Sequence, residues 1–245
     1  MRYLILSDIH ANWEALQAVL AAAEGLYEEI LCLGDLVGYG ADPNPVVEWV
    51  RDHVKVVIRG NHDKACSGID SLEWFNEIAR LAATWTHDGL SQENLAYLMR
   101  LVKGPAYVNG MILVHGSILD EDEYVVSPRD AAQVFPYLDS KITLFGHTHL
   151  QGGFALSQDK LQIIRPQPSL GPQYLEIQED EKYLLNPGSV GQPRDGDWRS
   201  AFVVYDTEQR HVVFYRIEYD LATAQEKIRS AGLPPHLAAR LAVGR

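Results

Sequence analysis

The chain has 245 residues, and its 21 lysine and arginine residues against 33 aspartate and glutamate residues give a formal net charge of −12. Apolar residues make up 47% of the chain and charged residues 22%, which is typical of a globular protein with a sizeable core. The acidity argues against strong binding of nucleic acid or of anionic membranes, because both need an excess of lysine and arginine. One small anionic substrate is still allowed, since it responds to the charges near its own site.

The first half of the chain alternates strand-like and helix-like segments. Short apolar runs at 3–7, 29–33 and 54–58 each end in polar residues and predict buried strands. Asn12 can cap a helix after the first run, and Pro43 can begin a helix after the second. This repeated strand, loop and helix predicts a mainly parallel arrangement, with polar loops at the carboxyl ends of the strands, where ligands bind in open α/β sheets.

The second half begins with helical segments and continues with strands. Residues 71–101 predict two helices broken near Asp88-Gly89, and 105–115 predict a hairpin that turns at Asn109-Gly110. A helix over 127–138 and a strand over 142–145 follow. From there the pattern has a period of two, and it predicts strands near 151–157, 161–165, 174–177, 182–185, 200–206 and 211–217. We expect one α/β domain over 1–245, with two sheets that share a core and with a C-terminal helix and tail from about residue 220.

Two features concern the compartment. The opening apolar run at 4–6 is far too short for a membrane helix or a signal sequence. Cys32 and Cys66 give no disulfide framework, which favours a reduced environment. We therefore expect a cytoplasmic protein with no membrane partner, and the sequence does not specify an oligomeric state.

Polar groups of unusual type follow five of the predicted strands. They occur in the segments Asp8-Ile9-His10, Gly34-Asp35, Gly60-Asn61-His62-Asp63, His115-Gly116 and Gly146-His147-Thr148-His149, which hold five of the nine histidines. Carboxylates and imidazoles that meet at one sheet edge need positive charge between them, because they would otherwise be desolvated or repel one another. The pattern therefore predicts a metal site.

The ligand types narrow the choice of metal. Oxygen and imidazole ligands without thiolate suit Mn²⁺, which we expect first, and also Fe, Zn²⁺, Ni²⁺ or Mg²⁺. The candidates are too many for one ion with open positions, so two divalent ions that share one carboxylate account for them better. These candidates are Asp8, His10, Asp35, Asn61, His115, His147 and His149. Two such ions would make the centre attractive to anions inside an acidic protein.

The ordered series of motifs resembles the calcineurin-like metallophosphoesterase superfamily, and in particular its small bacterial and archaeal phosphodiesterase branch. The resemblance runs from residue 1 to about 195, since the segment Asn186-Pro187-Gly188-Ser189-Val190-Gly191 is similar to the loop that closes the site in small members. It implies a four-layer α/β/β/α sandwich with two mixed sheets.

The resemblance also implies roles for the motif residues. Asp8, His10 and His149 would hold the first metal, Asn61, His115 and His147 would hold the second, and Asp35 would bridge both. His62 would stand over the substrate and donate a proton to the leaving oxygen or stabilise charge there, and we group the adjacent Asp63 with it as a candidate catalytic residue. The implied reaction is hydrolysis of a small phosphate monoester or diester by in-line attack of a metal-bridging hydroxide.

Two positions depart from the motif of protein Ser/Thr phosphatases, which reads Gly-Asp-x-x-Asp-Arg-Gly. Gly38 stands where that motif has an Asp that orients the catalytic histidine, and Tyr39 stands where it has an Arg. These changes argue against phosphoprotein phosphatase activity and leave the metal ligands intact. The same fold would also suit a non-catalytic metal-binding scaffold or a nuclease. The complete ligand set with His62 argues against the scaffold, and the acidity argues against the nuclease.

Candidate substrate contacts lie next to the motifs. Asn12 either donates to a phosphate or only caps its helix, Arg194 either reaches a phosphate or is an exposed turn residue, and Tyr39 either stacks on a base or packs. We expect Trp74 to pack in the core and 120–123, an acidic run, to be a solvated loop.

Overall fold

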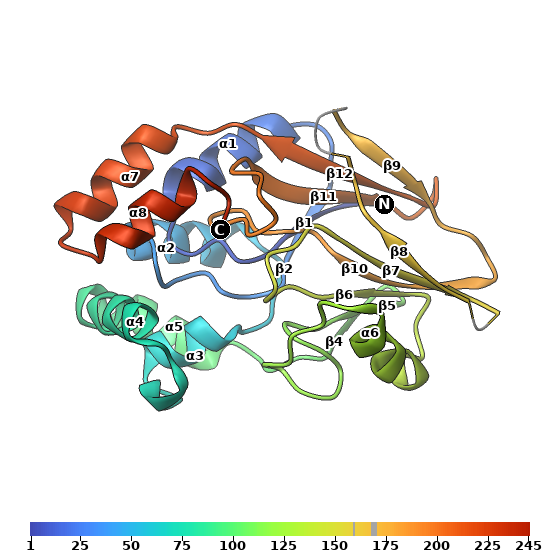
Figure 1. The fold of residues 1–245 in the computed structure, drawn as a ribbon, viewed down its shortest axis with the longest axis horizontal. Coiled ribbons are helices and arrows are strands. Elements are labelled where there is room, and N and C mark those ends of the chain that lie inside the picture. Colours follow the sequence, from blue (N-terminus) through green and yellow to red (C-terminus); the bar gives the residue numbers. More distant parts are fainter. Residues whose placement is uncertain (159, 168–170) are drawn as a thin grey trace.

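The computed structural model describes residues 1–158, 160–167 and 171–245. Within these residues, the strands form two six-stranded sheets (Figure 1). The first sheet has the order β3-β2-β1-β11-β12-β9, and its strands in chain order are β1 (Arg2–Leu6), β2 (Glu29–Cys32), β3 (Val56–Val57), β9 (Gln173–Glu176), β11 (Ser200–Asp206) and β12 (His211–Ile217). β1, β2 and β3 are parallel, whereas β11 is antiparallel to β1, so the sheet is mixed.

The second sheet is also mixed. Its order is β4-β5-β6-β10-β7-β8, and its strands are β4 (Ala106–Val108), β5 (Met111–Leu113), β6 (Ile142–Leu144), β7 (Gly152–Ser157), β8 (Lys160–Ile164) and β10 (Glu181–Asn186). The β4–β5 hairpin turns at Asn109-Gly110 as expected, with both residues at positive φ. β5 and β6 are parallel, so both end at the same edge.

The helices lie on the outer faces of the two sheets. Those against the first sheet are α1 (Trp13–Ala23), α2 (Pro43–His53), α4 (Glu77–Gly89), α5 (Gln92–Arg100), α7 (Leu221–Ser230) and α8 (Pro235–Leu241). The second sheet is covered by α6 (Pro128–Val134) and the 3₁₀ turn η2 (Phe135–Tyr137). Figure 1 shows α7 and α8, in red, packed side by side next to α1.

The apolar side chains form three layers, which establishes the four-layer α/β/β/α sandwich. In β1, Tyr3 and Ile5 lie between the two sheets, while the alternate residues Leu4 and Leu6 face the helices. The outer face of the second sheet packs on α6 through a separate cluster that includes Ile112, Val114, Phe145, Phe154 and Leu184. The expected fold class is confirmed.

Three local expectations need correction. The third strand is only two residues long rather than 54–58, because Val54 is the C-cap of α2 and Ile58 forms only an isolated bridge with Val102. A short helix, α3 (Asn61–Ser67), follows it and was not expected, and a 3₁₀ turn, η1 (Leu72–Trp74), precedes α4. The C-terminal tail contains a second helix, α8, which packs against α7.

Candidate metal centre

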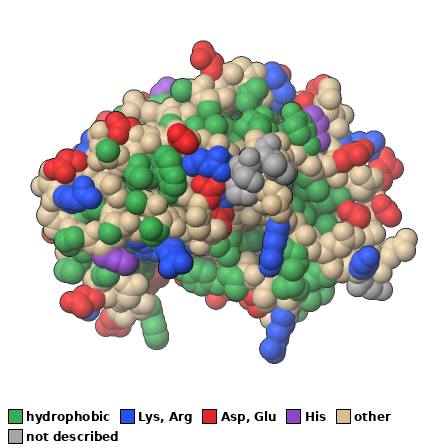
Figure 2. All heavy atoms as spheres, turned by 45° about the horizontal axis from the view of Figure 1, so that its top comes forward, with side chains coloured by type: hydrophobic (Ala, Val, Ile, Leu, Met, Phe, Trp, Pro, Cys, Tyr) green, Lys and Arg blue, Asp and Glu red, His purple; other side chains and the backbone are tan. Residues whose placement is uncertain are grey.

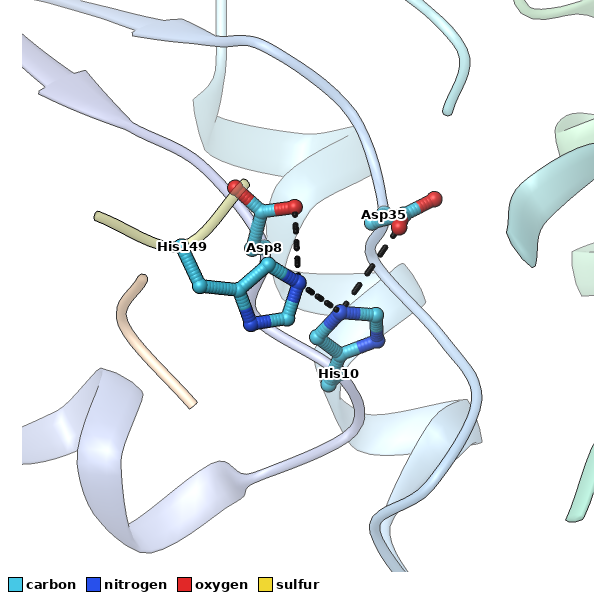
Figure 3. A group of neighbouring side chains, drawn as sticks. All are labelled: Asp8, His10, Asp35 and His149. Atoms are coloured by element: carbon cyan, nitrogen blue, oxygen red, sulfur yellow. Dashed lines mark hydrogen bonds and ion pairs between the residues drawn. The ribbon is translucent and has the colours of Figure 1, made fainter. Parts of the chain in front are cut away.

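Four buried side chains meet at the carboxyl ends of β1, β2 and β6. One ligand atom each from Asp8, His10, Asp35 and His149 lies within 4.8 Å of the others. Figure 3 shows these groups pointing toward one another, Asp8 and His10 from the loop after β1, Asp35 from the loop after β2 and His149 from the loop after β6. His149 Nε2 lies 3.3 Å from Asp8 Oδ1 and 3.1 Å from His10 Nε2, and His10 Nε2 lies 3.6 Å from Asp35 Oδ2. Parallel strands bring these loops together because they end at one edge.

A second group adjoins the first and shares Asp35 with it. Ligand atoms of Asp35, His115 and His147 also lie within 4.8 Å of one another, and His115 Nε2 is 3.5 Å from Asp35 Oδ2. The Asn61 side chain points to the same place, with its Oδ1 3.3 Å from His115 Nε2. The structure therefore brings together all seven residues that the sequence proposes as ligands, in two groups joined by one carboxylate.

Backbone carbonyls fix the orientation of three of the imidazoles. Nδ1 of His10 lies 3.0 Å from the carbonyl oxygen of Val37, Nδ1 of His115 lies 2.7 Å from that of Leu33, and Nδ1 of His149 lies 2.5 Å from that of Gln192. A carbonyl can only accept, so each Nδ1 carries the proton and each Nε2 turns inward. Metal-binding histidines are commonly held in this way.

In this tautomer, the Nε2 atoms that face the centre are placed as metal ligands would be. When His10 and His149 are neutral, both Nε2 atoms carry lone pairs, and two acceptors at 3.1 Å have no hydrogen to share. Nε2 of His147 is buried and, among the described residues, has no hydrogen-bond partner. Divalent cations, one in each group, would satisfy these three atoms, so the donor set fits the two metals that the sequence predicts.

Burial keeps most of these imidazoles neutral. It lowers the pKa of His10 and His149 well below the usual value and lowers the pKa of His147 to about 3. Burial also lowers the pKa of His115, but the Asp35 carboxylate outweighs it and raises that pKa to about 10. His115 is thus the counter-cation of Asp35 in the metal-free protein, and binding of a metal there would displace its proton.

The backbone at the centre is strained. Asp8, His10, Asp35, His147 and His149 all have φ between 49° and 64°, the left-handed region that residues with a side chain rarely adopt. Each such residue costs about 1–3 kcal/mol, and this conformation persists only where the surroundings impose it. Its concentration at five of the seven ligand candidates indicates that the loops are shaped by the centre rather than by folding stability.

His62 lies beside the two groups and lines a cavity of about 330 Å³. Its ring packs on Tyr39, with ring centroids 4.3 Å apart, and meets His10 and Phe75 edge-on. Gly38 lies directly against it. A Cβ at residue 38 would come 2.5 Å from His62 Nδ1, so no aspartate could stand there. His62 Nδ1 is accordingly buried and, among the described residues, unpartnered.

Asp63 does not belong with His62 as a group that could touch a substrate. Its side chain is fully buried, and its oxygens accept from the backbone N–H groups of Asp35, Leu36 and Gly60 at 2.8–2.9 Å. It ties the loop after β2 to the loop after β3. We correct its role to a positioning residue that sets where Asp35 stands.

The Asn12 side chain is also used structurally. Its Oδ1 accepts from the N–H of Ala15 and caps α1, and its Nδ2 donates to the carbonyl of Gly191 at 2.9 Å. Both ends are occupied and the residue is buried, so we withdraw it as a phosphate contact.

Arg194, by contrast, is close to the centre. Its guanidinium carbon lies 5.8 Å from the centroid of the Tyr39 ring.

Two surface expectations are wrong. The acidic run 120–123 is not simply solvated, because Glu121 binds Arg59 and Lys64, and Asp122 also binds Lys64. These ion pairs hold the loop against α3. Trp74 is 89% exposed rather than packed in the core, and it lines the same cavity as His62.

Several residues around the centre carry no signal in the sequence. The carbonyls of Leu33, Val37 and Gln192 are invisible to sequence reasoning, because every residue has a carbonyl. Tyr124, whose ring centroid is 3.9 Å from that of His147, sits in an ordinary loop. Its position depends on how the two sheets pack.

Comparison with known proteins agrees with this geometry. The sequence model of the calcineurin-like phosphoesterase superfamily domain matches residues 1–210. The chain belongs to this superfamily. It is 38% identical over 251 residues to the uncharacterized protein MJ0912 of Methanocaldococcus jannaschii, covering 98% of this chain and 97% of that protein.

Solved structures of other proteins have the same fold. The crystal structure of a metallophosphoesterase from Sphaerobacter thermophilus matches with a TM-score of 0.88 and 40% identity, covering 100% of this chain and 99% of that one. The hypothetical protein PH1004 from Pyrococcus horikoshii matches in fold with a TM-score of 0.81 at 20% identity, covering 100% and 98%. Family membership and the ligand groups together support phosphoester hydrolysis and binding of divalent metal.

The surface charge and the length of the helices concern binding to nucleic acid and to membranes. On the face in Figure 2, lysine and arginine side chains are scattered among aspartate and glutamate side chains. Among the described residues, no helix combines the length and apolar character needed to cross a bilayer. The expectation that long polyanions bind poorly stays a prediction.

Proposed function

We propose that the protein is a dinuclear metal-dependent phosphoesterase that hydrolyses a small phosphate monoester or diester. The observation that supports this most directly is the pair of buried ligand groups joined by Asp35. Asp8, His10 and His149 would hold one ion, Asn61, His115 and His147 would hold the other, and Asp35 would contact both. When bound, two divalent ions supply positive charge that polarises a phosphoryl group and lowers the pKa of water, with Mn²⁺ the first candidate.

The protein itself would supply position and shape. The carbonyls behind His10, His115 and His149 hold the rings so that their Nε2 atoms need not reorganise during the reaction. Asp63 fixes the loop that carries Asp35. Preorganisation of this kind is a major source of rate enhancement, because the enzyme makes no rearrangement at the moment of reaction.

His62 would act on the leaving group. Burial lowers its pKa to about 4, so the ring is neutral near pH 7. Nδ1 is buried beside Gly38 and, among the described residues, has no acceptor, so we assign the proton of the neutral ring to Nε2. From there it would donate a hydrogen bond to the oxygen on which charge develops. A single donor of this kind contributes about 100- to 1000-fold to turnover.

Metal stoichiometry and turnover test this proposal together. We expect wild-type protein to bind two Mn²⁺ ions per chain by mass spectrometry, and to hydrolyse bis-p-nitrophenyl phosphate or p-nitrophenyl phosphate only when Mn²⁺ is present. His10→Ala and His147→Ala should each lose one ion, and Asp35→Asn should lose both. His53→Ala is the matched control, because His53 is exposed and bonds only to the carbonyl of Trp49.

The outcomes separate an enzyme from a metal-binding scaffold. Two bound ions without hydrolysis of any phosphate ester would favour the scaffold. Full turnover by Asp35→Asn, or full turnover after chelation of metal, would refute the dinuclear mechanism. His62→Ala should keep both ions and lose at least about 100-fold in kcat.

A further inference from the structure

A second cavity continues from the one beside His62. The first cavity, of about 330 Å³, lies over the centre, and the second, of about 360 Å³, lies toward α8. Tyr39 and Asn76 line both, so the two cavities adjoin, and we call them together the groove. The second cavity is also lined by Arg240 and His236 of α8. Nothing in the hydrolysis of a simple phosphate ester requires this second space.

Two arginines converge on the tyrosine between the cavities. The guanidinium carbons of Arg194 and Arg240 each lie 5.8 Å from the centroid of the Tyr39 ring, so they are at most twice that distance apart. They come from elements far apart in the chain, the loop after β10 and the helix α8. Like charges repel, so a bound anion would stabilise two half-buried guanidinium groups that lie near one ring.

No acidic side chain supplies that anion. Among the residues that the structure describes, no aspartate or glutamate lies within ion-pair distance of either arginine. Arg194 donates to Gln192 and lies beside the Tyr124 hydroxyl, while its Nε is buried and unpartnered. Arg240 donates through its Nε to a main-chain oxygen of Arg245, the last residue of the sequence, so its Nη groups are the ones that a ligand would contact. In a chain with a net charge of −12, two such cations at one site are unexpected.

Acidic residues also line the groove, but each of them is engaged elsewhere or faces water. Asp70 and Asp122 line the first cavity, and both lie within ion-pair distance of Lys64. Glu77 lines the second cavity and is exposed to solvent. Burial and the charge of Arg194 both lower the pKa of Arg240, as expected of a cation that has no acidic side chain beside it.

The arginine pair is also close to the reacting centre. The ring of Tyr39 lies 4.3 Å from the ring of His62 and 4.8 Å from the ring of His10, measured between centroids. An anion held by the arginines would therefore be one aromatic ring away from His62, the residue proposed to act on the leaving group.

We propose that Arg194 and Arg240 form a second anion subsite, and that the substrate is a phosphoester whose leaving group carries another phosphate. Arginine suits this task because its planar donors match phosphate oxygens. The inference rests on the proposed function, since it adds a substrate class to the same centre. We expect Arg240 to determine this specificity, because it lines the second cavity, in which the other phosphate would lie.

A matched pair of inhibitors tests the subsite. Adenosine 3′,5′-bisphosphate and adenosine 3′-monophosphate differ only in the second phosphate, and the aromatic side chains of Trp74 and Phe75 in the first cavity suit a nucleoside. Each is measured as a competitive inhibitor of bis-p-nitrophenyl phosphate hydrolysis by the Mn²⁺-loaded protein. We expect the bisphosphate to bind at least about tenfold more tightly, the effect of one charge-assisted contact.

Substitutions then assign the preference to Arg240. Arg240→Gln should reduce the ratio of the two inhibition constants toward one, and Arg240→Lys should keep part of it because the charge remains. The ratio within one variant cancels any general change in activity. Arg229→Gln is the control, because Arg229 is an exposed arginine on the neighbouring helix α7 and lies near Glu226. It should keep the full ratio.

The results separate this inference from the proposed function. Equal binding of both nucleotides by the wild type, or an undiminished ratio in Arg240→Gln, would overturn the subsite. If the protein hydrolyses no ester, calorimetry of the same two nucleotides replaces inhibition. A preserved preference for the bisphosphate would then support the subsite while the proposed function fails.

Discussion

Replacement of Gly38 by alanine tests the contact on which the position of His62 depends. Gly38 has φ of +85°, and a Cβ there would lie 2.5 Å from His62 Nδ1, whereas ordinary contact begins near 3.4 Å. The imidazole would have to move by nearly an ångström, because the Cβ is fixed to the backbone. The left-handed backbone adds about 1–2 kcal/mol of strain for any residue with a Cβ.

Gly25→Ala separates the two effects. Gly25 has φ of +76°, but a Cβ there would meet nothing within 4 Å. Both variants should therefore lose about 1–2 kcal/mol of unfolding free energy, which lowers Tm by a few degrees in a chain of this size. Only Gly38→Ala should lose turnover, by about 100-fold, since a misplacement of about 1 Å can cost that much.

The assays are urea unfolding, Mn²⁺ content by mass spectrometry, and hydrolysis of bis-p-nitrophenyl phosphate. Gly38→Ala should keep both ions, because His62 is not among the proposed ligands. Equal turnover by Gly38→Ala and Gly25→Ala would show that the position of His62 does not matter, and the argument from this contact would be wrong.

Three further outcomes are expected. Asp63→Ala leaves three buried N–H groups without an acceptor, so urea unfolding should show a loss of about 3 kcal/mol, and a loss below about 1 kcal/mol would contradict the tying role. Burial raises the pKa of Glu121, but Arg59 and Lys64 outweigh it and lower that pKa. The stabilisation by Glu121 is therefore present above its ordinary pKa and is lost as pH falls through the lower folded-state value, so Glu121→Gln should destabilise by about 1 kcal/mol at pH 7 and by less near pH 3. Exposed Glu93→Gln should show little change at either pH. Inorganic phosphate should bind at least about tenfold more tightly to Mn²⁺-loaded than to metal-free protein by calorimetry, and equal affinity would rule out an anion site made by the metals.

The positions of the ligand candidates could be predicted from sequence because the signals are local. Each of Asp8, Asp35 and His115 stands within two residues of the end of an apolar run, and parallel strands bring such ends together without further information. The helix caps of Asn12 and Ser91 are local signals too, and both caps form. The sandwich itself follows from strands that alternate between two buried faces.

The structural features that the sequence did not predict depend on tertiary contacts, which leave no local pattern in the sequence. The helix α3 has only seven residues and no apolar stripe, and it forms beside the loop that Asp63 ties. Arg240 lies in an Ala- and Leu-rich tail, and its proximity to Tyr39 exists only because α8 folds back over the centre. Trp74 looks like a core residue in sequence, whereas in the fold it stands at the rim of a cavity.

The ligand groups also join the two halves of the sandwich mechanically. Asp8 and Asp35 extend from the first sheet, whereas His115 and His147 extend from the second, and the layer between the sheets is packed largely by apolar side chains, whose contacts have no preferred direction. Ions bound between these residues would connect the two sheets and resist sliding of one sheet over the other. Loading with metal should therefore make local opening of this interface less frequent. The backbone amides of β5 and β6 should then exchange their hydrogens more slowly in the metal-loaded protein.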